Sequence, residues 1–390
     1  MAANDKTVLI LGAGFGGLTA ATELRKQLPH KHRVILVDQS PRFYECGFNL
    51  SLMTEEMKNP RQAEGDLSAL AGRGVEFVNE EVLRIDPAER VVETTSRSFE
   101  ADYVIVALGA RLAPEEIPGF TDNAYNLYEA SGAVELNQAL QDLHGGKIVI
   151  LVARTPFKCP AAPYEAAFLI EALLRRKGMR EETSVEVYTP EWAPMPVAGD
   201  QVGEELKSML TSRGIGYFPD HMVLKIEDRR LHFEIDDADY DLLVGVPPHE
   251  PPRVVQSAGL TDAAGWIPVN PKTLETKFPH VFAVGDIASI RLRNGMFLPM
   301  AGVFALQEGL VVASNISAEI KREAVRMEYQ GDGYCFIEVG DGLAAYGSGN
   351  FYEAPAPNVR LDPPSAEHKA EKDEFANALL RSLKATDPLS

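Results

Sequence analysis

A glycine-rich turn between two aliphatic segments constrains the fold of this chain more than any other feature. An aliphatic run over 6–11 precedes the turn, a helical pattern covers 18–28, and a second aliphatic run over 33–37 ends in Asp38. This order, with glycines spaced G-x-G-x-x-G, is typical of a βαβ dinucleotide-binding unit. We expect the helix N-terminus to attract a pyrophosphate and Asp38 to accept hydrogen bonds from ribose hydroxyls. The turn residues expected to hold the dinucleotide are Gly12, Gly14, Phe15, Gly16 and Gly17.

Two later segments indicate which dinucleotide binds. The run Ala-Asp-Tyr-Val-Ile-Val-Ala-Leu-Gly-Ala covers 101–110 and the run Val-Phe-Ala-Val-Gly-Asp covers 281–286. Both resemble motifs of the two-dinucleotide-binding-domain flavoproteins, and the resemblance extends from residue 6 to about residue 320. It implies FAD, with Asp286 on the ribityl chain and Val82, in a strand expected over 74–85, against the adenine. The other residues that it places at the cofactor are Ala107, Gly109 and Gly285.

The same resemblance implies an α/β fold with two Rossmann-like domains. The FAD-binding domain would be discontinuous, formed by 1–110 and 240–320. A second Rossmann-like domain that lacks a nucleotide glycine loop would occupy 111–239, and a C-terminal interface region with a tail helix would occupy 321–390.

The loop of the second domain carries a cysteine where a nucleotide loop would have glycines. No glycine occurs between Lys147 and Gly178, and prolines in this loop lack amide donors, so we do not expect direct reduction by NADH or NADPH. Cys159 precedes a helix expected over 164–177, whose N-terminus, together with Lys158, would favour the thiolate. Cys159 could instead be a buried cysteine that acts as a small hydrophobic residue.

A narrower resemblance rests on this loop and two other segments. The runs Cys-Pro-Ala-Ala-Pro-Tyr-Glu over 159–165, Leu-Pro-Met-Ala-Gly over 298–302 and Tyr-Cys-Phe-Ile-Glu over 334–338 are similar to those of the sulfide dehydrogenase flavoproteins. That family comprises sulfide:quinone oxidoreductases and the flavoprotein subunit of flavocytochrome c sulfide dehydrogenase. The resemblance implies a redox-active disulfide between Cys159 and Cys335, with Glu165 as acid and base. Taken alone, Glu165 could also be a solvated residue in a first helical turn.

The third cysteine, Cys46, lies eight residues after Asp38. In flavocytochrome c sulfide dehydrogenase a cysteine at this spacing is bonded to the flavin 8α-methyl, which implies covalent FAD at Cys46. Cys46 also resembles the single redox cysteine of coenzyme A disulfide reductases. A third interpretation is an unmodified cysteine near the flavin.

The segment before the helix expected over 303–320 departs from the family pattern. Related enzymes have Pro-Lys there, whereas this chain has Met300 after the proline, followed by Ala301 and Gly302. These three residues are expected at the flavin, where only the helix N-terminus remains to stabilise reduced, anionic flavin.

The C-terminal tail allows two interpretations. A proline-punctuated linker is expected over 353–364, and a helix over 365–384 with Phe375, Leu379, Leu380 and Leu383 on one stripe. Quinone reductases of the family dip C-terminal amphipathic helices into the membrane. This helix is short and flanked by glutamates, so we favour packing against its own protein.

Composition limits the partners. With 38 Lys and Arg against 57 Asp and Glu, the net charge is −19, which disfavours binding to nucleic acid and to anionic membrane. Three cysteines cannot form a disulfide scaffold, and no apolar run reaches the roughly 18 residues that span a bilayer. The start of the chain resembles no cleaved leader, so we expect a cytoplasmic protein, at most peripheral at the inner face of the membrane. The eight histidines show no ligand spacing, and no metal site is expected.

Together these features predict an FAD-dependent enzyme that oxidises sulfide, or a small persulfide or thiol, through Cys159 and Cys335 and reduces a quinone. The alternatives are an NAD(P)H-dependent disulfide or coenzyme A disulfide reductase that uses Cys46, a soluble sulfide dehydrogenase that donates to a cytochrome, and a non-catalytic redox-sensing flavoprotein. The oligomeric state is not indicated by the sequence.

Overall fold

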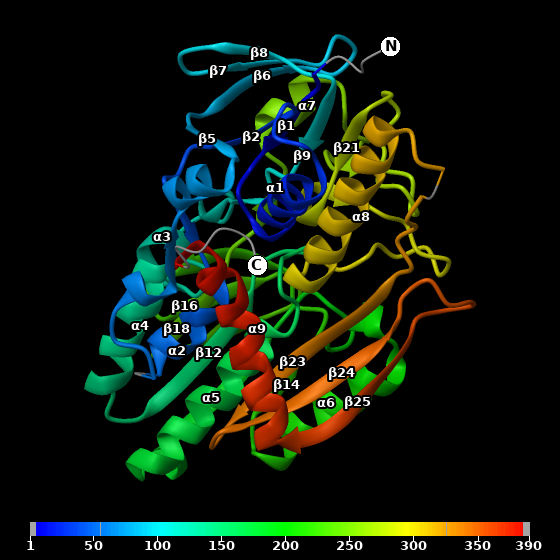
Figure 1. Ribbon diagram of the computed structural model, residues 1–390. Coiled ribbons are helices and arrows are strands. Elements are labelled where there is room, and N and C mark those ends of the chain that lie inside the picture. The colour runs from blue at the N-terminus through cyan, green and yellow to red at the C-terminus, as the bar shows by residue number, and fades with distance from the viewer. Residues whose placement is uncertain (1–4, 55, 325, 385–390) are drawn as a thin grey trace.

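Two parallel sheets form the centre of the protein in the computed structural model, which describes residues 5–54, 56–324 and 326–384 (Figure 1). The first sheet has the strand order β21-β9-β1-β2-β5. Every pairing in it is parallel, and its central strands are buried on both faces, which explains their unbroken aliphatic runs. Its strands are β1 (Thr7–Leu11), β2 (Arg33–Asp38), β5 (Glu76–Asn79), β9 (Tyr103–Val106) and β21 (Val281–Ala283).

The second sheet has the order β11-β18-β12-β13-β14 and is also parallel. Two such sheets with helical crossovers confirm the predicted α/β class. β18 pairs with β12, so the boundary expected between residues 239 and 240 lies too early; the remaining domain division stays a prediction. The strands are β11 (Tyr125–Asn126), β12 (Gly146–Val152), β13 (Thr183–Tyr188), β14 (Gly216–Phe218) and β18 (Leu242–Val246).

Helices pack on the faces of the sheets. α1 (Phe15–Gln27) and α8 (Gly302–Lys321) pack so closely that a Cβ added at Gly309 would lie 2.4 Å from the carbonyl oxygen of Gly16. α5 (Ala162–Lys177) is almost wholly buried beside β13 and β23, whereas α4 (Ala130–Asp142) is amphipathic. The expected helices over 18–28, 164–177 and 303–320 are therefore confirmed.

Small antiparallel sheets surround this centre. One is formed by β6 (Val82–Asp86), β7 (Val91–Thr94) and β8 (Ser98–Glu100), and another by β15 (Val223–Glu227), β16 (Arg230–Phe233) and β17 (Asp237–Asp239). The single strand expected over 74–85 is wrong, because the chain turns after β5 and begins β6 in a different sheet. The other elements include β3 (Arg42–Tyr44), β4 (Glu64–Asp66), β10 (Arg111–Leu112), β19 (His249–Glu250), β20 (Ile267–Pro268), β22 (Ala288–Ser289), α2 (Asn49–Met53), α3 (Phe120–Asn123), α6 (Asp200–Ser212) and α7 (Arg253–Ser257).

The C-terminal region is a three-stranded antiparallel sheet with one helix lying against it (Figure 1). β23 (Asp332–Gly340), β24 (Leu343–Asn350) and β25 (Asn358–Ser365) precede α9 (Ala366–Lys384). The expected linker over 353–364 is therefore wrong in its second half, where β25 pairs with β24. α9 packs against its own protein, as favoured above, with Leu380 and Leu383 buried.

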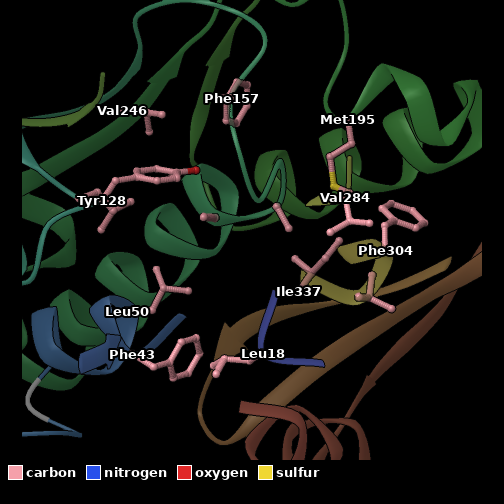
Figure 2. Close-up of a cluster of buried hydrophobic side chains, with 14 of the residues drawn as sticks. Leu18, Phe43, Leu50, Tyr128, Phe157, Met195, Val246, Val284, Phe304 and Ile337 are labelled. Atoms are coloured by element: carbon pink, nitrogen blue, oxygen red, sulfur yellow. The ribbon is translucent and has the colours of Figure 1, made fainter. Parts of the chain in front are cut away.

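One hydrophobic cluster joins these parts. It includes Leu18 of α1, Val246 of β18, Phe304 of α8 and Ile337 of β23, and Figure 2 shows these side chains around a common centre. The core is therefore continuous between the two parallel sheets and the C-terminal sheet. No helix among the described residues is both long and apolar enough to cross a membrane.

Candidate functional site

A largely apolar cavity of about 570 Å³ lies where the loop before α5, the N-terminus of α8, β23 and α9 meet. The residues around it come from segments that are far apart in the sequence. Eight of the predicted site residues line it: Phe15, Cys46, Cys159, Glu165, Met300, Ala301, Gly302 and Cys335.

Cys159 lies in the loop between β12 and α5 and faces this cavity. Its backbone is in the left-handed region, with φ of 52°. Its amide donates to the carbonyl oxygen of Met300 at 2.7 Å, and its own carbonyl oxygen accepts from the amide of Ala162 at 2.9 Å. The loop is therefore fixed onto the segment that begins α8. The interpretation of Cys159 as a buried hydrophobic residue is wrong, because its side chain is exposed to the cavity.

The other two cysteines also line the cavity and come from different elements. Cys335 lies in β23, opposite Gly347 of β24, and Cys46 begins a short 3₁₀ turn after β3. All three cysteines, each within the described part of the chain, are free thiols in the structure.

Burial raises the pKa of the three thiols at this cavity. It raises the pKa of Cys46 to about 11 and that of Cys335 to about 12, and it raises the pKa of Cys159 well above its ordinary value. The negative charge of Glu165 adds to the rise of the pKa at Cys159 and Cys335. Desolvation disfavours the charged form of a thiol. The expectation that the N-terminus of α5 favours the thiolate of Cys159 stays a prediction.

Glu165 lies in the first turn of α5 and is only 2% exposed, so its interpretation as a solvated residue is wrong. Its Oε1 accepts hydrogen bonds from the amide of Glu338 at 2.8 Å and from Nζ of Lys372 at 2.6 Å. Lys372 reaches in from α9 and also donates to Oε2 of Glu338 at 2.9 Å. Burial raises the pKa of Glu165, and the charge of Lys372 opposes that rise.

Three residues of this site were not predicted from the sequence: Glu45, Glu338 and Lys372. Glu45 is 4% exposed, lines the cavity beside Cys46 and accepts from the amide of Phe48 at 3.1 Å. Burial raises its pKa to about 7. Its position next to Cys46 could have drawn attention to it. Nothing in the sequence of α9 separates Lys372 from the surface lysines of an amphipathic helix.

The glycine turn after β1 has the shape of a phosphate cradle. Gly12 has φ of 101°, and a Cβ at Gly17 would lie 1.9 Å from the carbonyl oxygen of Gly12. A Cβ at Gly14 would meet nothing within 4 Å, and no side chain caps the N-terminus of α1. The free amides of the first turn and the open space beside Gly14 fit a pyrophosphate.

The acidic residues expected at the dinucleotide lie at the ends of strands of the first sheet. Asp38 ends β2, and its two carboxylate oxygens accept from the amides of Ala13 at 2.7 Å and Ser40 at 2.8 Å, which leaves lone pairs for ribose hydroxyls. Asp286 follows β21, and burial raises its pKa. The amide of Gly285 donates to Glu308 at 2.6 Å.

The remaining predicted residues surround the same turn. Ala107 follows β9 and donates to the carbonyl oxygen of Leu11 at 2.7 Å, and Gly109 has φ of 64°. Val82 begins β6 and its side chain is buried in a second hydrophobic cluster with Leu9, so its contact with an adenine stays a prediction. The residue set as a whole fits a flavin dinucleotide laid from the turn toward the cavity.

Comparison with known proteins places this chain in a recognised family. Residues 6–309 match the family described as pyridine nucleotide-disulphide oxidoreductase. The chain is 26% identical to the mitochondrial sulfide:quinone oxidoreductase of Mus musculus over 305 residues, which cover 74% of this chain and 67% of the mouse protein. It is 24% identical to the sulfide-quinone reductase of Aquifex aeolicus over 363 residues, with 86% and 82% covered.

Relatives with another electron donor are also similar. The type II NADH:quinone oxidoreductase of Staphylococcus aureus is 24% identical over 375 residues, with 88% of this chain and 90% of that protein covered. Among solved structures, the sulfide:quinone oxidoreductase of Aquifex aeolicus superposes with a TM-score of 0.87 at 22% identity, covering 98% of this chain and 92% of that one. This likeness shows the shared fold.

Proposed function

Because the chain belongs to the pyridine nucleotide-disulphide oxidoreductase family, we propose that it is an FAD-dependent oxidoreductase that oxidises sulfide and reduces a quinone. The observation that carries the proposal is the gathering of Cys159, Cys335 and Glu165 around one cavity. The sulfide:quinone oxidoreductases among its relatives support the choice of substrate and acceptor.

The glycine turn, Asp38, Asp286 and the N-terminus of α8 would hold FAD, and Met300 to Gly302 would lie at its flavin ring. When bound, FAD supplies an acceptor for two electrons beside the cysteines. α8 has no side-chain cap at Ala301, so its first amides and its dipole can stabilise negative charge on the reduced ring.

The cysteines would do the sulfur chemistry. Hydrogen sulfide attacks a disulfide between Cys159 and Cys335, the S–S bond breaks, and one cysteine becomes a persulfide while the other leaves as a thiolate. One proton is released in this step, and Glu165 is the carboxylate at hand to accept it. The thiolate left by this step is the group that would deliver the electron pair to bound FAD.

Cys46 would carry the flavin covalently through a thioether. It lines the same cavity as Met300 and Gly302, the residues expected at the flavin ring. Covalent linkage predicts that the yellow colour stays with acid-precipitated protein; flavin found wholly in the supernatant would exclude it.

An anaerobic titration with sulfide tests the function directly. Micromolar sulfide should bleach the flavin within seconds, and a short-chain quinone should restore the colour. Cys159→Ser and Cys335→Ser should each slow bleaching by about 1,000-fold while leaving the flavin bound, because a single thiol cannot form the disulfide. Wild-type rates in either variant, or no bleaching of the native protein, would overturn the proposal. Cys46→Ser should lose the flavin that stays with acid-precipitated protein. If the protein were instead a disulfide reductase that uses Cys46, this variant would lose all disulfide reductase activity.

A further inference from the structure

The C-terminal helix, α9, brings two lysines to the buried carboxylates Glu165 and Glu338. Lys372 donates to Oε1 of Glu165 at 2.6 Å and to Oε2 of Glu338 at 2.9 Å. Lys369, one turn earlier on α9, lies 3.6 Å from Oε1 of Glu338 and 2.7 Å from Asp373. Lys372 is thus the lysine that contacts Glu165, the proposed acid and base. Lys369 contacts Glu338 and Asp373 instead.

Both carboxylates of this cluster are buried: Glu165 is 2% exposed and Glu338 is 3% exposed. A buried carboxylate without a cation partner takes up a proton, because its charged form loses the solvation by water. Glu165 also lies near Glu338, Cys159 and Cys335, which are negative when they are ionised. Lys372 is the cation in direct contact with it among the described residues. The titratable and charged groups around this cluster are Glu338 and Cys335 of β23, Cys159 of the loop before α5, Tyr128 after β11, Glu45 and Cys46 after β3, Glu56, and Lys369, Lys372 and Asp373 of α9.

The contacts of Glu165 also leave one oxygen available. Oε1 is occupied by the amide of Glu338 and by Lys372, whereas Oε2 has no hydrogen-bond partner among residues 5–54, 56–324 and 326–384. Glu165 lines the cavity that Cys159 and Cys335 share. Oε2 is therefore the oxygen of Glu165 that is open to a proton released at the cysteines.

We propose that Lys372 is a positioning residue of the sulfide reaction, which holds Glu165 ionised and leaves its Oε2 free to accept the substrate proton. This inference rests on the proposed function for its reaction but concerns a residue outside the cysteine and flavin motifs. In the reaction, hydrogen sulfide and the disulfide give a persulfide, a thiolate and one proton, and the proton goes to Oε2. The C-terminal helix thereby becomes part of the catalytic site.

The pH profile of anaerobic flavin reduction by sulfide tests this role. Lys372→Met should slow flavin reduction about tenfold or more at pH 7. The limb of the pH profile on which Glu165 loses its proton should move upward by about one pH unit, since the buried carboxylate then holds its proton more tightly. Lys372→Arg, which keeps the charge, should restore the rate to within about threefold. Lys369→Met is the matched control on the same helix and should keep the native profile. The ionisation of sulfide is common to all variants and cancels in the comparison.

A change of opposite sign separates positioning from mere support of the fold. Glu338→Gln keeps the backbone amide that donates to Glu165 but removes a negative charge, so it should shift the limb downward. A profile of Lys372→Met that is slower but unshifted, or the same shift in Lys369→Met, would refute the positioning role.

Infrared spectroscopy gives a readout without turnover. Lys372→Met should show a protonated-carboxyl band at neutral pH that disappears in the double variant with Glu165→Gln. If this band appears while sulfide bleaches no flavin, the lysine holds Glu165 ionised and the proposed reaction is wrong. If sulfide bleaches the native flavin but the band is missing, the reaction stands and the role of Lys372 is wrong. Visible spectra of bound flavin and melting temperatures would show that each variant is folded.

Discussion

The two parallel sheets each carry a strand, a loop and a helix in the same order, yet the two loops have opposite chemistry. After β1, Gly12 adopts φ of 101°, and the first turn of α1 has no side-chain cap, so its amides face open space. After β12, Cys159 adopts φ of 52°, and its amide is already bonded to Met300. One topology therefore provides a phosphate cradle in the first case and a fixed thiol in the second. Loop residues, rather than strand order, decide what each half can do.

Substitutions in the first loop should have the largest effect. Gly17→Ala places a methyl group 1.9 Å from the carbonyl oxygen of Gly12, so we expect it to destabilise the protein by about 3 kcal/mol and to abolish FAD binding. Gly14→Ala meets no atom within 4 Å and has extended backbone, so it should fold normally and still lose FAD, because its methyl group fills the space for the pyrophosphate. Flavin fluorescence after gel filtration and denaturant midpoints measure both effects. FAD retained by Gly14→Ala would break the comparison.

The second loop should not accept a pyridine nucleotide. The residues from 147 to 177 include no glycine, and the prolines at 156 and 160 offer no amide. NADH and NADPH should therefore bleach the flavin at least about 100-fold more slowly than sulfide at equal concentration. Stopped-flow absorbance under anaerobic conditions measures both rates. Equal rates would make the second sheet a nucleotide domain and would place this chain with the NADH:quinone oxidoreductases.

The close packing that supports the first loop should depend on pH. Burial raises the pKa of Glu308 on α8 to about 8 from an ordinary 4.5, so the folded protein keeps a proton that the unfolded chain releases. The contribution to stability is complete below pH 4.5 and is lost as the pH rises toward 8. Glu308→Gln should remove this loss, which amounts to about 2–5 kcal/mol between pH 5 and 8. Denaturant midpoints at the two pH values measure it, and an unchanged difference in the variant would exclude Glu308 as the source.

The left-handed backbone of Cys159 should give the smallest effect. A residue with a Cβ costs about 1 kcal/mol more than glycine in this region. Cys159→Gly should therefore be about 1 kcal/mol more stable than Cys159→Ala, although both lack the thiol. Urea midpoints of the two variants give the difference. Equal midpoints would mean that the backbone at Cys159 is not strained. The two loops would then share only their place between a strand and a helix.

Much of the fold could be predicted from the sequence because strands and helices here carry clear local patterns. The runs around Leu9, Ile150 and Val104 are buried strands, and the long helices were placed within a few residues. Two expectations failed for a tertiary reason. The strand expected over 74–85 is divided because β6 pairs with β7, outside the first parallel sheet. Residues 358–365 become β25 by pairing with β24, and a proline-containing run gives no local sign of that pairing.

The candidate site was predicted only where a motif marked it. The three cysteines and Glu165 stood in recognisable runs, and the structure places all four at one cavity. Lys372, Glu338 and Glu45 were not predicted, since their importance comes from where α9 and β23 lie in space. The sequence shows the helix that follows Cys159, but it does not show the packing that raises the pKa of this thiol.

The sequence alone determined the class of this protein, because glycines, acidic strand ends and cysteines act through local backbone geometry that a motif encodes. Only the tertiary structure decided the charge state of the site. The burial of Glu165, the arrival of Lys372 from a helix more than 200 residues away, and the raised pKa values of the thiols all depend on which side chains exclude water from the cavity. Desolvation is a property of the packed assembly, so no stretch of sequence carries it.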